Sequence, residues 1–548
     1  MNSPSTSNPA FPPEARPMFP GSPYSPVHSP ARRAGYAAIG MLLATLVNLG
    51  NGIVLANIPV FAGARSDYLV AVSLLPGVYI ACNASANLML VKGRAQFGIP
   101  KVTSLLLLAY ASCALLLAVA PDSRLFAILL CASGGFAAAG LTTLSVYYMM
   151  QSLPQPIKPL GLVAAIGFVQ LGTPLGHLVP IDLVADGGWR TLALTELAIA
   201  LIAGGAIALH PLPPSDRSKA FEPLDGLTLG LFLVANLCLC IALATGRLLW
   251  WSDTPWLGIA IVTALLLYSV GSAIEANRRN PLLRLEWIGS WTILRYAAIA
   301  LVVRLALSEQ TYGAFGFLGL AGLDNDQFHI LYALIVVGLL LGTVAAAASL
   351  AEQRLPYQVM VAALVIAVAA WIDSGSNNLT RPENLYLTQS LIAFGTTLFI
   401  GPALVYGSLQ MLHRGPQYLV SHVVLFSMTQ NIGGLAGSAL FGTYQIARTK
   451  VHAAALAEGM MVGDPRIIER IQNGAATLSG HVGDPALRSA EGAGLLGQAL
   501  TREAAILGFN DAFTMVALVA LSTALFVAVV ILRIKFNIRL PFQYGASR

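Results

Sequence analysis

The stretch Gly167–Pro180, GFVQLGTPLGHLVP, places three glycines and two prolines inside an apolar run long enough to cross a membrane. Glycine and proline weaken a helix interior by about 1 and about 3 kcal/mol relative to alanine. Small residues let membrane helices approach closely, and proline permits a bend. We therefore expect a smooth strip at a helix contact, with a bend, from Gly167, Gly172, Pro174 and Gly176. A kinked, packed helix without further role would show the same pattern.

The composition is that of a membrane protein. Of its 548 residues, 56% are hydrophobic and only 10% are charged, whereas soluble domains have about 25% charged residues. We therefore expect an all-α polytopic membrane protein. The basic residues are spread through short loops, which argues against nucleic-acid binding. The five cysteines lie in apolar runs without metal-site spacing, so no metal site is expected.

Runs of about 20 apolar residues can cross a bilayer as helices. We expect fourteen such spans, at 34–62, 68–91, 102–120, 124–151, 159–183, 190–211, 227–247, 256–276, 288–320, 328–351, 357–373, 385–412, 419–447 and 511–534. The C-terminal end of the seventh span is poorly defined by the sequence, and the ninth span is long enough to be tilted or broken. An even number puts both termini on one side. Lys and Arg are more frequent in the loops of that side, so the positive-inside rule makes it the cytoplasm.

Motifs along the chain follow the order of a known family. LGNGIVLANIPVF (49–61), GGWR (187–190), NPLLRLEW (280–287), SMTQNIGGLAGSALFGT (427–443) and LTREAAILGFNDAF (500–513) resemble segments of the fourteen-helix drug:proton antiporter branch of the major facilitator superfamily. The opening stretch is similar to its antiporter motif, Gly-x-x-x-Gly-Pro-x-x-Gly-Gly, with Thr173 inserted and His177 in the last glycine position. The resemblance covers residues 34–536.

The charges typical of this family are missing here. Gly50 stands where the family has an Asp in its first helix. Ala95 and Gln96 replace the Asp-Arg pair that follows the second helix. Cys131 and Gln430 stand in the positions of arginines in helices four and thirteen. The family's proton-handling residues therefore cannot be carried over, and the chain resembles a divergent member.

The resemblance implies a major facilitator fold of two six-helix bundles plus two extra helices. Residues 34–212 would form the first bundle, residues 213–280 two linker helices with cytoplasmic loops, and residues 281–536 the second bundle. Residues 1–33, rich in Pro and Ser, and residues 537–548 would be cytoplasmic tails, the first of them disordered. The periplasmic loop 448–510 has the pattern of short interfacial helices.

Ionisable residues within membrane spans are rare and usually functional, because each costs about 2.5–3.5 kcal/mol to insert. The candidates for proton coupling or substrate binding are Glu309, Glu196, Arg304 and His177. Arg304 and Glu309 are five residues apart and point about 140° from each other on a helix. They are therefore not expected to pair on their own helix, although a purely structural pairing across helices is an alternative.

Polar residues are expected to line a central cavity between the bundles. They are Asn51, Asn57, Asn83, Asn87, Gln170, Gln310, Gln430 and Asn431. A mostly apolar cavity with few polar groups suits bulky amphipathic compounds better than sugars. For a single asparagine, a hydrogen bond between helices is an alternative role.

The resemblance implies a proton-coupled exporter of hydrophobic or amphipathic small molecules, a multidrug efflux antiporter of the bacterial inner membrane. The chain has no phosphate-binding loop or hydrolase motif, so we expect no enzymatic activity and no cofactor, with the proton gradient as energy source. Related pumps work with a periplasmic adaptor and an outer-membrane channel, for which 448–510 would be a docking surface. One alternative is an uptake permease for a small organic acid, favoured if Arg304 or Arg295 lines the cavity. Another is a non-transporting receptor or scaffold.

Overall fold

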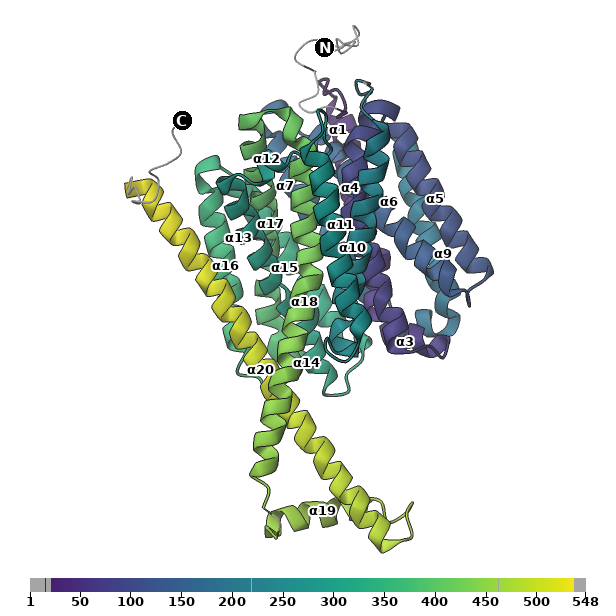
Figure 1. The fold of residues 1–548 in the computed structure, drawn as a ribbon, viewed down its shortest axis with the longest axis vertical. Helices are drawn as coiled ribbons and strands as arrows, with labels where there is room; N and C mark the ends of the chain where they lie inside the picture. The colour runs from purple at the N-terminus through teal and green to yellow at the C-terminus, as the bar shows by residue number, and fades with distance from the viewer. Residues whose placement is uncertain (1–14, 16–20, 218, 462, 537–548) are drawn as a thin grey trace.

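The computed structural model describes residue 15 and residues 21–217, 219–461 and 463–536. In these ranges 14 spans are long and apolar enough to cross a membrane. The helices stand side by side in one bundle, and α1 begins and α20 ends at the same end of it (Figure 1). We call this the tail end. The opposite end, beyond which α18 and α20 extend, is the stalk end.

The first half of the bundle holds six spans. Its helices are α1 (Pro30–Leu46), α2 (Leu49–Ala56), α3 (Ile58–Ala64), α4 (Leu69–Phe97), α5 (Ile99–Val119), α6 (Arg124–Ser152), η2 (Gln155–Ile157), α7 (Lys158–Val169), α8 (Gly172–His177) and α9 (Ile181–Leu209). The expected first span, 34–62, is divided into three helices, and only α1 and α2 belong to the crossing segment. A shared core of buried aromatic and aliphatic side chains joins these helices.

Two extra helices follow, α10 (Pro223–Leu249) and α11 (Pro255–Ala276). Helix α10 packs against α4 of the first half and also against α18 of the second half. Both extra helices stand on the face of the bundle that carries α4 and α18 (Figure 1). They therefore lie beside the boundary between the halves.

The second half holds the remaining six spans. Its helices are α12 (Leu285–Ile288), α13 (Trp291–Ala306), η3 (Glu309–Ala314), α14 (Phe315–Gly319), η4 (Asn325–Phe328), α15 (His329–Ala348), η5 (Glu352–Arg354), α16 (Leu355–Asp373), η6 (Pro382–Leu385), α17 (Tyr386–Arg414), η7 (Pro416–Tyr418), α18 (Leu419–Glu458), α19 (Pro465–Thr477) and α20 (Pro485–Phe536). The ninth span is broken into α13, the π-helix η3 and α14.

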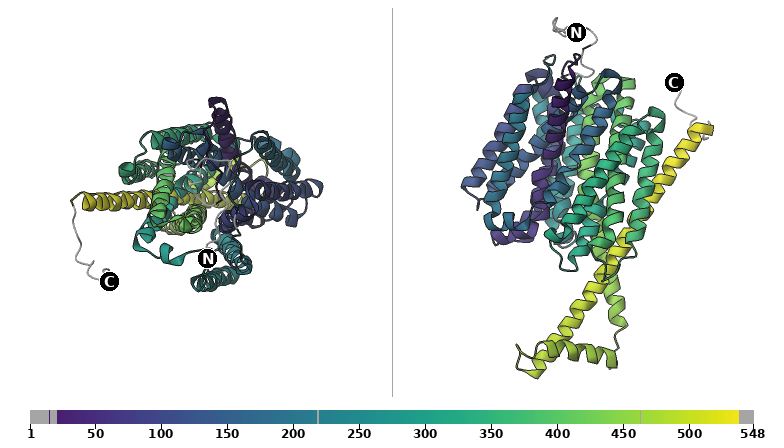
Figure 2. Two further views of the ribbon diagram at one scale, coloured as in Figure 1. Left: turned by 90° about the horizontal axis from the view of Figure 1, so that it is seen from above. Right: turned by 180° about the vertical axis from the view of Figure 1, so that it is seen from behind.

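The segment 448–510 differs from the expected interfacial loop. Helix α18 continues into it as far as Glu458, α20 begins within it at Pro485, and α19 joins their ends away from the bundle (Figure 2). We call residues 448–510 the stalk. At the junction of α19 with α20, a β-carbon on Gly492 would collide with the carbonyl of Ile471, so the two helices cross in close contact.

The N-terminal tail is partly ordered, which also differs from the expectation. Tyr24 donates from its amide to the carbonyl of Pro214 (2.9 Å) and from its hydroxyl to Asp216 (2.6 Å). His28 lies 2.9 Å from Gln151 of α6. Residues 21–29 are thus packed on the tail end of the first half. Residues 1–14, 16–20 and 537–548, also expected to be tails, lie outside the described residues.

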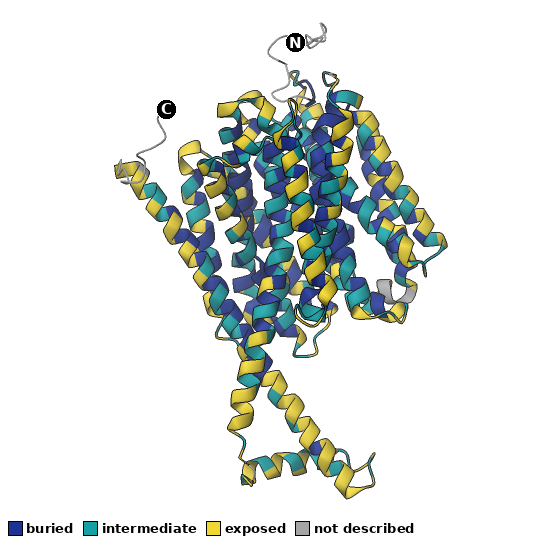
Figure 3. Cartoon of the chain, viewed as in Figure 1, coloured by how far each residue is buried: buried dark blue, intermediate teal, exposed yellow. Residues whose placement is uncertain are grey.

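The residues exposed on the outside of the bundle are of the kind that faces lipid rather than water. Residues exposed on the outward faces of the spans surround a buried interior (Figure 3). Many of these exposed residues are large and apolar, including Leu105, Leu108, Leu201, Leu265 and Leu266. An apolar belt of this kind is what a surface in contact with lipid tails requires.

Candidate functional site: a central cavity between the halves

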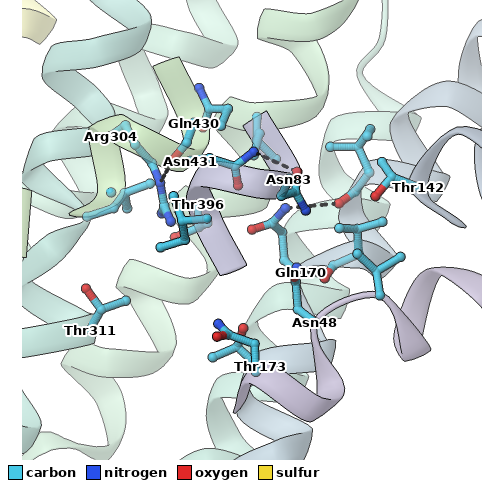
Figure 4. A pocket seen from close by; sticks show the side chains of 18 of the residues that line it. Asn48, Asn83, Thr142, Gln170, Thr173, Arg304, Thr311, Thr396, Gln430 and Asn431 are labelled. Atoms are coloured by element: carbon cyan, nitrogen blue, oxygen red, sulfur yellow. Dashed lines mark hydrogen bonds between the residues drawn. The ribbon is translucent and has the colours of Figure 1, made fainter. Parts of the chain in front are cut away.

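A cavity of about 960 Å³ lies between the two halves. Helices α2, α4, α6, α7 and α8 line it from one side, and α13, α15, α17 and α18 line it from the other. Figure 4 shows Asn48, Asn83 and Gln170 of the first half facing Arg304, Gln430 and Asn431 of the second half across this space. Most of the remaining wall is apolar.

The opening stretch of the sequence forms one part of this wall, with a break rather than a smooth bend. Helix α7 ends at Val169 and α8 begins at Gly172. The break falls at Gln170, four residues before Pro174, whose missing N–H removes the hydrogen bond to that carbonyl. The break turns the polar side chain of Gln170 onto the cavity wall.

The glycines of this stretch do not form a single strip. Gly172 and Gly176 pack against the backbone of α1 and α2 in the same half, whereas Gly167 packs against Thr343 of α15 in the other half. Gly172 and Gly176 are four residues apart in α8 and lie about 40° apart on one face, whereas Gly167 belongs to α7, on the other side of the break. Gly167 therefore serves the contact between the halves, and the other two serve the interior of the first half.

The eight polar residues that the sequence predicts to line the cavity all lie on its wall: Asn51, Asn57, Asn83, Asn87, Gln170, Gln310, Gln430 and Asn431. Two of their hydrogen bonds join the halves. Asn431 of α18 donates to Asn83 of α4 (3.1 Å), and Asn87 of α4 donates to Ser427 of α18 (2.9 Å). These bonds lie near the middle of α4 and in the first third of α18. They close one side of the cavity with side chains that can part and bond again.

A second set of contacts joins the halves nearer the stalk end. Asn325 donates to the backbone carbonyl of His177 (2.7 Å), and the amide of Ile181 donates to Asp326 (3.0 Å). The ring of His177 packs on Tyr332 with centroids 4.3 Å apart, and its Nδ1 lies 2.9 Å from the Thr173 carbonyl. His177 therefore occupies a contact between the halves as well as the cavity wall.

Basic side chains dominate the charge of the cavity wall. Its basic residues are Arg94, Lys158, Arg247 and Arg304, and in the described part of the chain Asp324 is the one acidic residue on the wall. None of these four forms an ion pair with a described carboxylate. The cavity is therefore positively charged.

Each of three cations is held by a neutral group. Arg304 donates from Nε to the backbone carbonyl of Gln430 (2.9 Å). The guanidinium of Arg94 lies 5.4 Å from the ring centre of Tyr147, and that of Arg247 lies 4.6 Å from the ring centre of Tyr312. A buried cation without an anionic partner is unfavourable, so these positions favour an anion in the cavity.

Glu196 of α9 does not line the cavity. It is buried inside the first half, and its carboxylate lies against Gly50 of α2. Gly50 is the position where the resembling family has an aspartate in its first helix. The acidic group therefore reaches this place from α9 instead of α2.

Glu309 does not line the cavity either. It begins the π-helix η3, and its side chain is 1% exposed. The side-chain nitrogen of Gln389 donates to Glu309 and to Asp373, at 2.9 Å each. Arg304 points instead to α18, so Arg304 and Glu309 do not pair with each other.

A buried charge network at the tail end ties the extra helices to the first half. Lys92 of α4 pairs with Asp225 of α10 (3.0 Å). Arg278, after α11, pairs with Asp225 (2.7 Å), Glu275 (2.7 Å) and Glu222 (2.8 Å). The Arg278 guanidinium beside Glu222 holds the pKa of that carboxyl below its usual range.

Comparison with solved structures identifies the architecture. A bacterial homologue of the human drug peptide transporters PepT1 and PepT2 matches with a TM-score of 0.55 and 11% identity, over 92% of this chain and 100% of that chain. An auto-inhibited POT family peptide transporter matches with 0.51 and 16% identity, over 94% and 99%. The human organic anion transporter MFSD10 matches with 0.50 and 14% identity, over 90% and 100%. The chain has the major facilitator fold.

No family model matches the chain, and no curated protein matches it in sequence. Identities this low establish the major facilitator fold and leave the substrate open. Membership of the drug:proton antiporter branch stays a prediction from the sequence motifs. The cavity of this chain therefore carries the evidence for its function.

Four charged residues that matter for the site are absent from the sequence-based candidates. Arg94 and Lys158 fall between the expected spans and Arg247 is the last residue of the expected span 227–247, yet all three line the cavity. Asp373 is the last residue of the expected span 357–373 and resembles a loop carboxylate, yet it is 2% exposed. A charge near the end of a span is the signal that these residues share.

Proposed function

We propose that the protein is a proton-coupled secondary active transporter of amphipathic organic anions. The observation that carries this proposal is the cavity wall, on which four basic residues without ion pairs face one acidic residue. An anionic substrate would supply the missing counter-charge. In the major facilitator fold, such a substrate binds between halves that rock to give alternating access.

The cavity also constrains the size and polarity of the substrate. Its volume of about 960 Å³ lies at the upper end of the range for drug-sized ligands. Leu, Ile, Val and Phe side chains make up much of the wall, which favours a substrate with a large apolar part. An amphipathic anion meets both conditions better than a small organic acid does.

This proposal narrows the two transport functions expected from the sequence. Arg304 lines the cavity, which is the condition that favours an organic acid, whereas Arg295 does not line it. The apolar wall supports an amphipathic compound, as expected for an efflux protein. Export remains the proposed direction of transport. The resemblance to the antiporter motifs is its only support.

The setting of the transporter is part of the proposal. Both termini would face the cytoplasm of a bacterial cell, with the stalk on the periplasmic side of the inner membrane. The stalk would give a periplasmic adaptor a surface on which to dock, and an outer-membrane channel would complete the route. The proton gradient would supply the energy, with no cofactor and no enzymatic step.

The test uses purified protein in proteoliposomes with an imposed pH gradient of either sign. We expect accumulation of carboxyfluorescein, an anion, and little movement of ethidium, a cation. Arg304→Gln should lower carboxyfluorescein transport at least tenfold, and Arg304→Lys should retain more activity because it keeps the charge. The sign of the effective gradient gives the direction of transport.

Exposed arginines away from the cavity provide the matched control. Arg470→Gln removes a cation from α19 in the stalk and should leave transport unchanged. Preferential transport of ethidium would overturn the anion proposal and favour export of cationic drugs. Transport of neither probe, nor of other dyes of both charges, would favour the receptor or scaffold alternative.

A further inference from the structure

Three buried side chains in the second half form a cluster outside the cavity wall. Glu309 of η3, Asp373 at the end of α16 and Gln389 of α17 are 1%, 2% and 0% exposed. The single amide nitrogen of Gln389 donates to both carboxyl groups, which also lie within hydrogen-bond reach of each other. Glu309 Oε2, Asp373 Oδ1 and Gln389 Oε1 have no hydrogen-bond partner.

Two ionised carboxylates would be unfavourable in this place. Neither forms an ion pair with a described basic side chain. The neighbouring α20 contributes Phe513 beside Gly313, and its Asp511 is held by Arg448 and His452. Burial and mutual repulsion both favour a shared proton, which would also give an unpartnered oxygen a hydrogen bond.

Asp373 borders a pocket at the stalk end. The pocket has a volume of about 320 Å³ and is lined by Asp373 together with residues 372, 384 and 385 and residues 375–377, 379 and 380 of the loop 375–380. Asn510 of α20 fixes this loop by donating to the Ser376 carbonyl (2.8 Å). Asp373 is thus the member of the pair that water in this pocket can reach.

Glu309 is the member of the pair nearest the central cavity. The next residue, Gln310, lines that cavity and donates to the backbone carbonyl of Gln389 (2.9 Å). Residue 389 is therefore held from the cavity side by Gln310 and from the pocket side by the two carboxyl groups.

We propose that Asp373 and Glu309 form a proton-binding pair that loads from the pocket at the stalk end and delivers its proton toward the central cavity. This inference rests on the proposed function, because the proton bound by the pair would drive the proposed transport. Asp373 takes the proton from water, and the neutral acid passes it to Glu309 while Asp373 becomes a carboxylate again. No electron is transferred and no further reactant is needed.

The π-helix η3 offers the movement that completes delivery. A π-turn holds one residue more than an α-turn, and such turns are frequent at functional sites. Rewinding η3 to an α-helix would rotate Glu309 by about 100° relative to the segment after it. This rotation equals the step between Glu309 and Gln310, so it would bring the carboxyl group toward the cavity side.

The experiment separates proton coupling from substrate binding. Wild type, Asp373→Asn and Glu309→Gln are compared in proteoliposomes, first for carboxyfluorescein accumulation driven by a pH gradient and then for carboxyfluorescein counterflow without a gradient. We expect both variants to lose accumulation at least tenfold and to keep counterflow within about twofold. Loss of counterflow as well, in variants that elute as folded protein, would overturn the inference.

Two controls fix the place of the pair. Glu503→Gln removes an exposed acid that hydrogen-bonds to Asn378 of the same loop, and it should change neither readout. In a cysteine-free background, Leu379→Cys places a thiol in the pocket lining. Its reaction with a bulky thiol reagent should slow accumulation and spare counterflow. Unchanged accumulation after complete labelling would contradict access through this pocket.

A spectroscopic readout decides the inference without any transported probe. Infrared difference spectra of the purified protein between acid and alkaline pH should contain a protonated-carboxyl band. Asp373→Asn and Glu309→Gln should each remove or shift this band, and Glu503→Gln should leave it unchanged. If no dye is transported, a band that depends on both residues still supports the proton-binding pair, and its absence from wild type overturns it.

Discussion

The carboxylate of Glu196 on α9 lies against Gly50 of α2, in the space that a β-carbon at position 50 would occupy. Only glycine at position 50 allows this carboxylate to approach the α2 backbone so closely. The resembling family places an acidic side chain on the first helix at the corresponding position. The same location in the first half therefore carries a carboxylate in both arrangements, although it comes from a different helix.

This relationship predicts a double-mutant rescue. Gly50→Asp should destabilise the protein by about 1–3 kcal/mol through overpacking, and Glu196→Ala should lower proton-driven accumulation. Gly50→Asp combined with Glu196→Ala should recover part of the stability and part of the accumulation, because the new carboxylate fills the vacated space. Thermal unfolding in detergent and uptake in proteoliposomes measure the two effects. Additive losses in the double variant would show that the two positions do not share one role.

Much of the fold is predictable from the sequence because the bilayer constrains it locally. A span needs about 20 apolar residues and its backbone must bond within itself, so the apolar runs alone indicate the 14 spans. The breaks within spans are harder to predict. Pro174 marks the break at Gln170, whereas the π-turn that begins at Glu309 contains no proline and lies against α17, α18 and α20.

The candidate site was predictable only in part. The polar residues of mid-span helices were found because an asparagine or glutamine stands out in an apolar run. Arg94 and Lys158 were missed because a sequence gives the distance of a residue from the end of a span and not the direction of its side chain. The stalk was missed for a related reason, since local helix propensity in 448–510 does not reveal that α18 and α20 each extend into it as one unbroken helix.

The network at the tail end predicts unequal effects of two similar substitutions. Asp225 has a side chain that is 0% exposed and bridges Lys92 and Arg278, whereas the Glu222 side chain is 43% exposed. Asp225→Asn should cost about 3–5 kcal/mol because it leaves the buried Lys92 without its ion-pair partner, although Arg278 keeps Glu275 and Glu222. Glu222→Gln should cost less than about 1 kcal/mol, since solvent screens the pair.

The Glu222 effect should also depend on pH. Its pKa is lowered in the folded protein by Arg278, so its stabilising contribution is present above the unfolded pKa, about 4.3, and is lost as pH falls through the folded value. Unfolding temperatures of wild type and Glu222→Gln should therefore differ at pH 7 and converge in acid. A difference that grows on acidification would contradict the assigned partner.

The two kinds of glycine in the opening stretch predict different responses to an added methyl group. At Gly167 the nearest atoms belong to the Thr343 side chain in the other half, whereas at Gly172 they are backbone atoms of Thr45 and Asn48. Gly167→Ala should impair transport by wedging the halves apart, and Thr343→Ala should partly restore it because the hydroxyl and methyl groups are removed. Gly172→Ala should lower thermal stability with no rescue by Thr343→Ala, since helix backbone cannot move aside. Equal rescue of both variants would place Gly172 at the boundary between the halves.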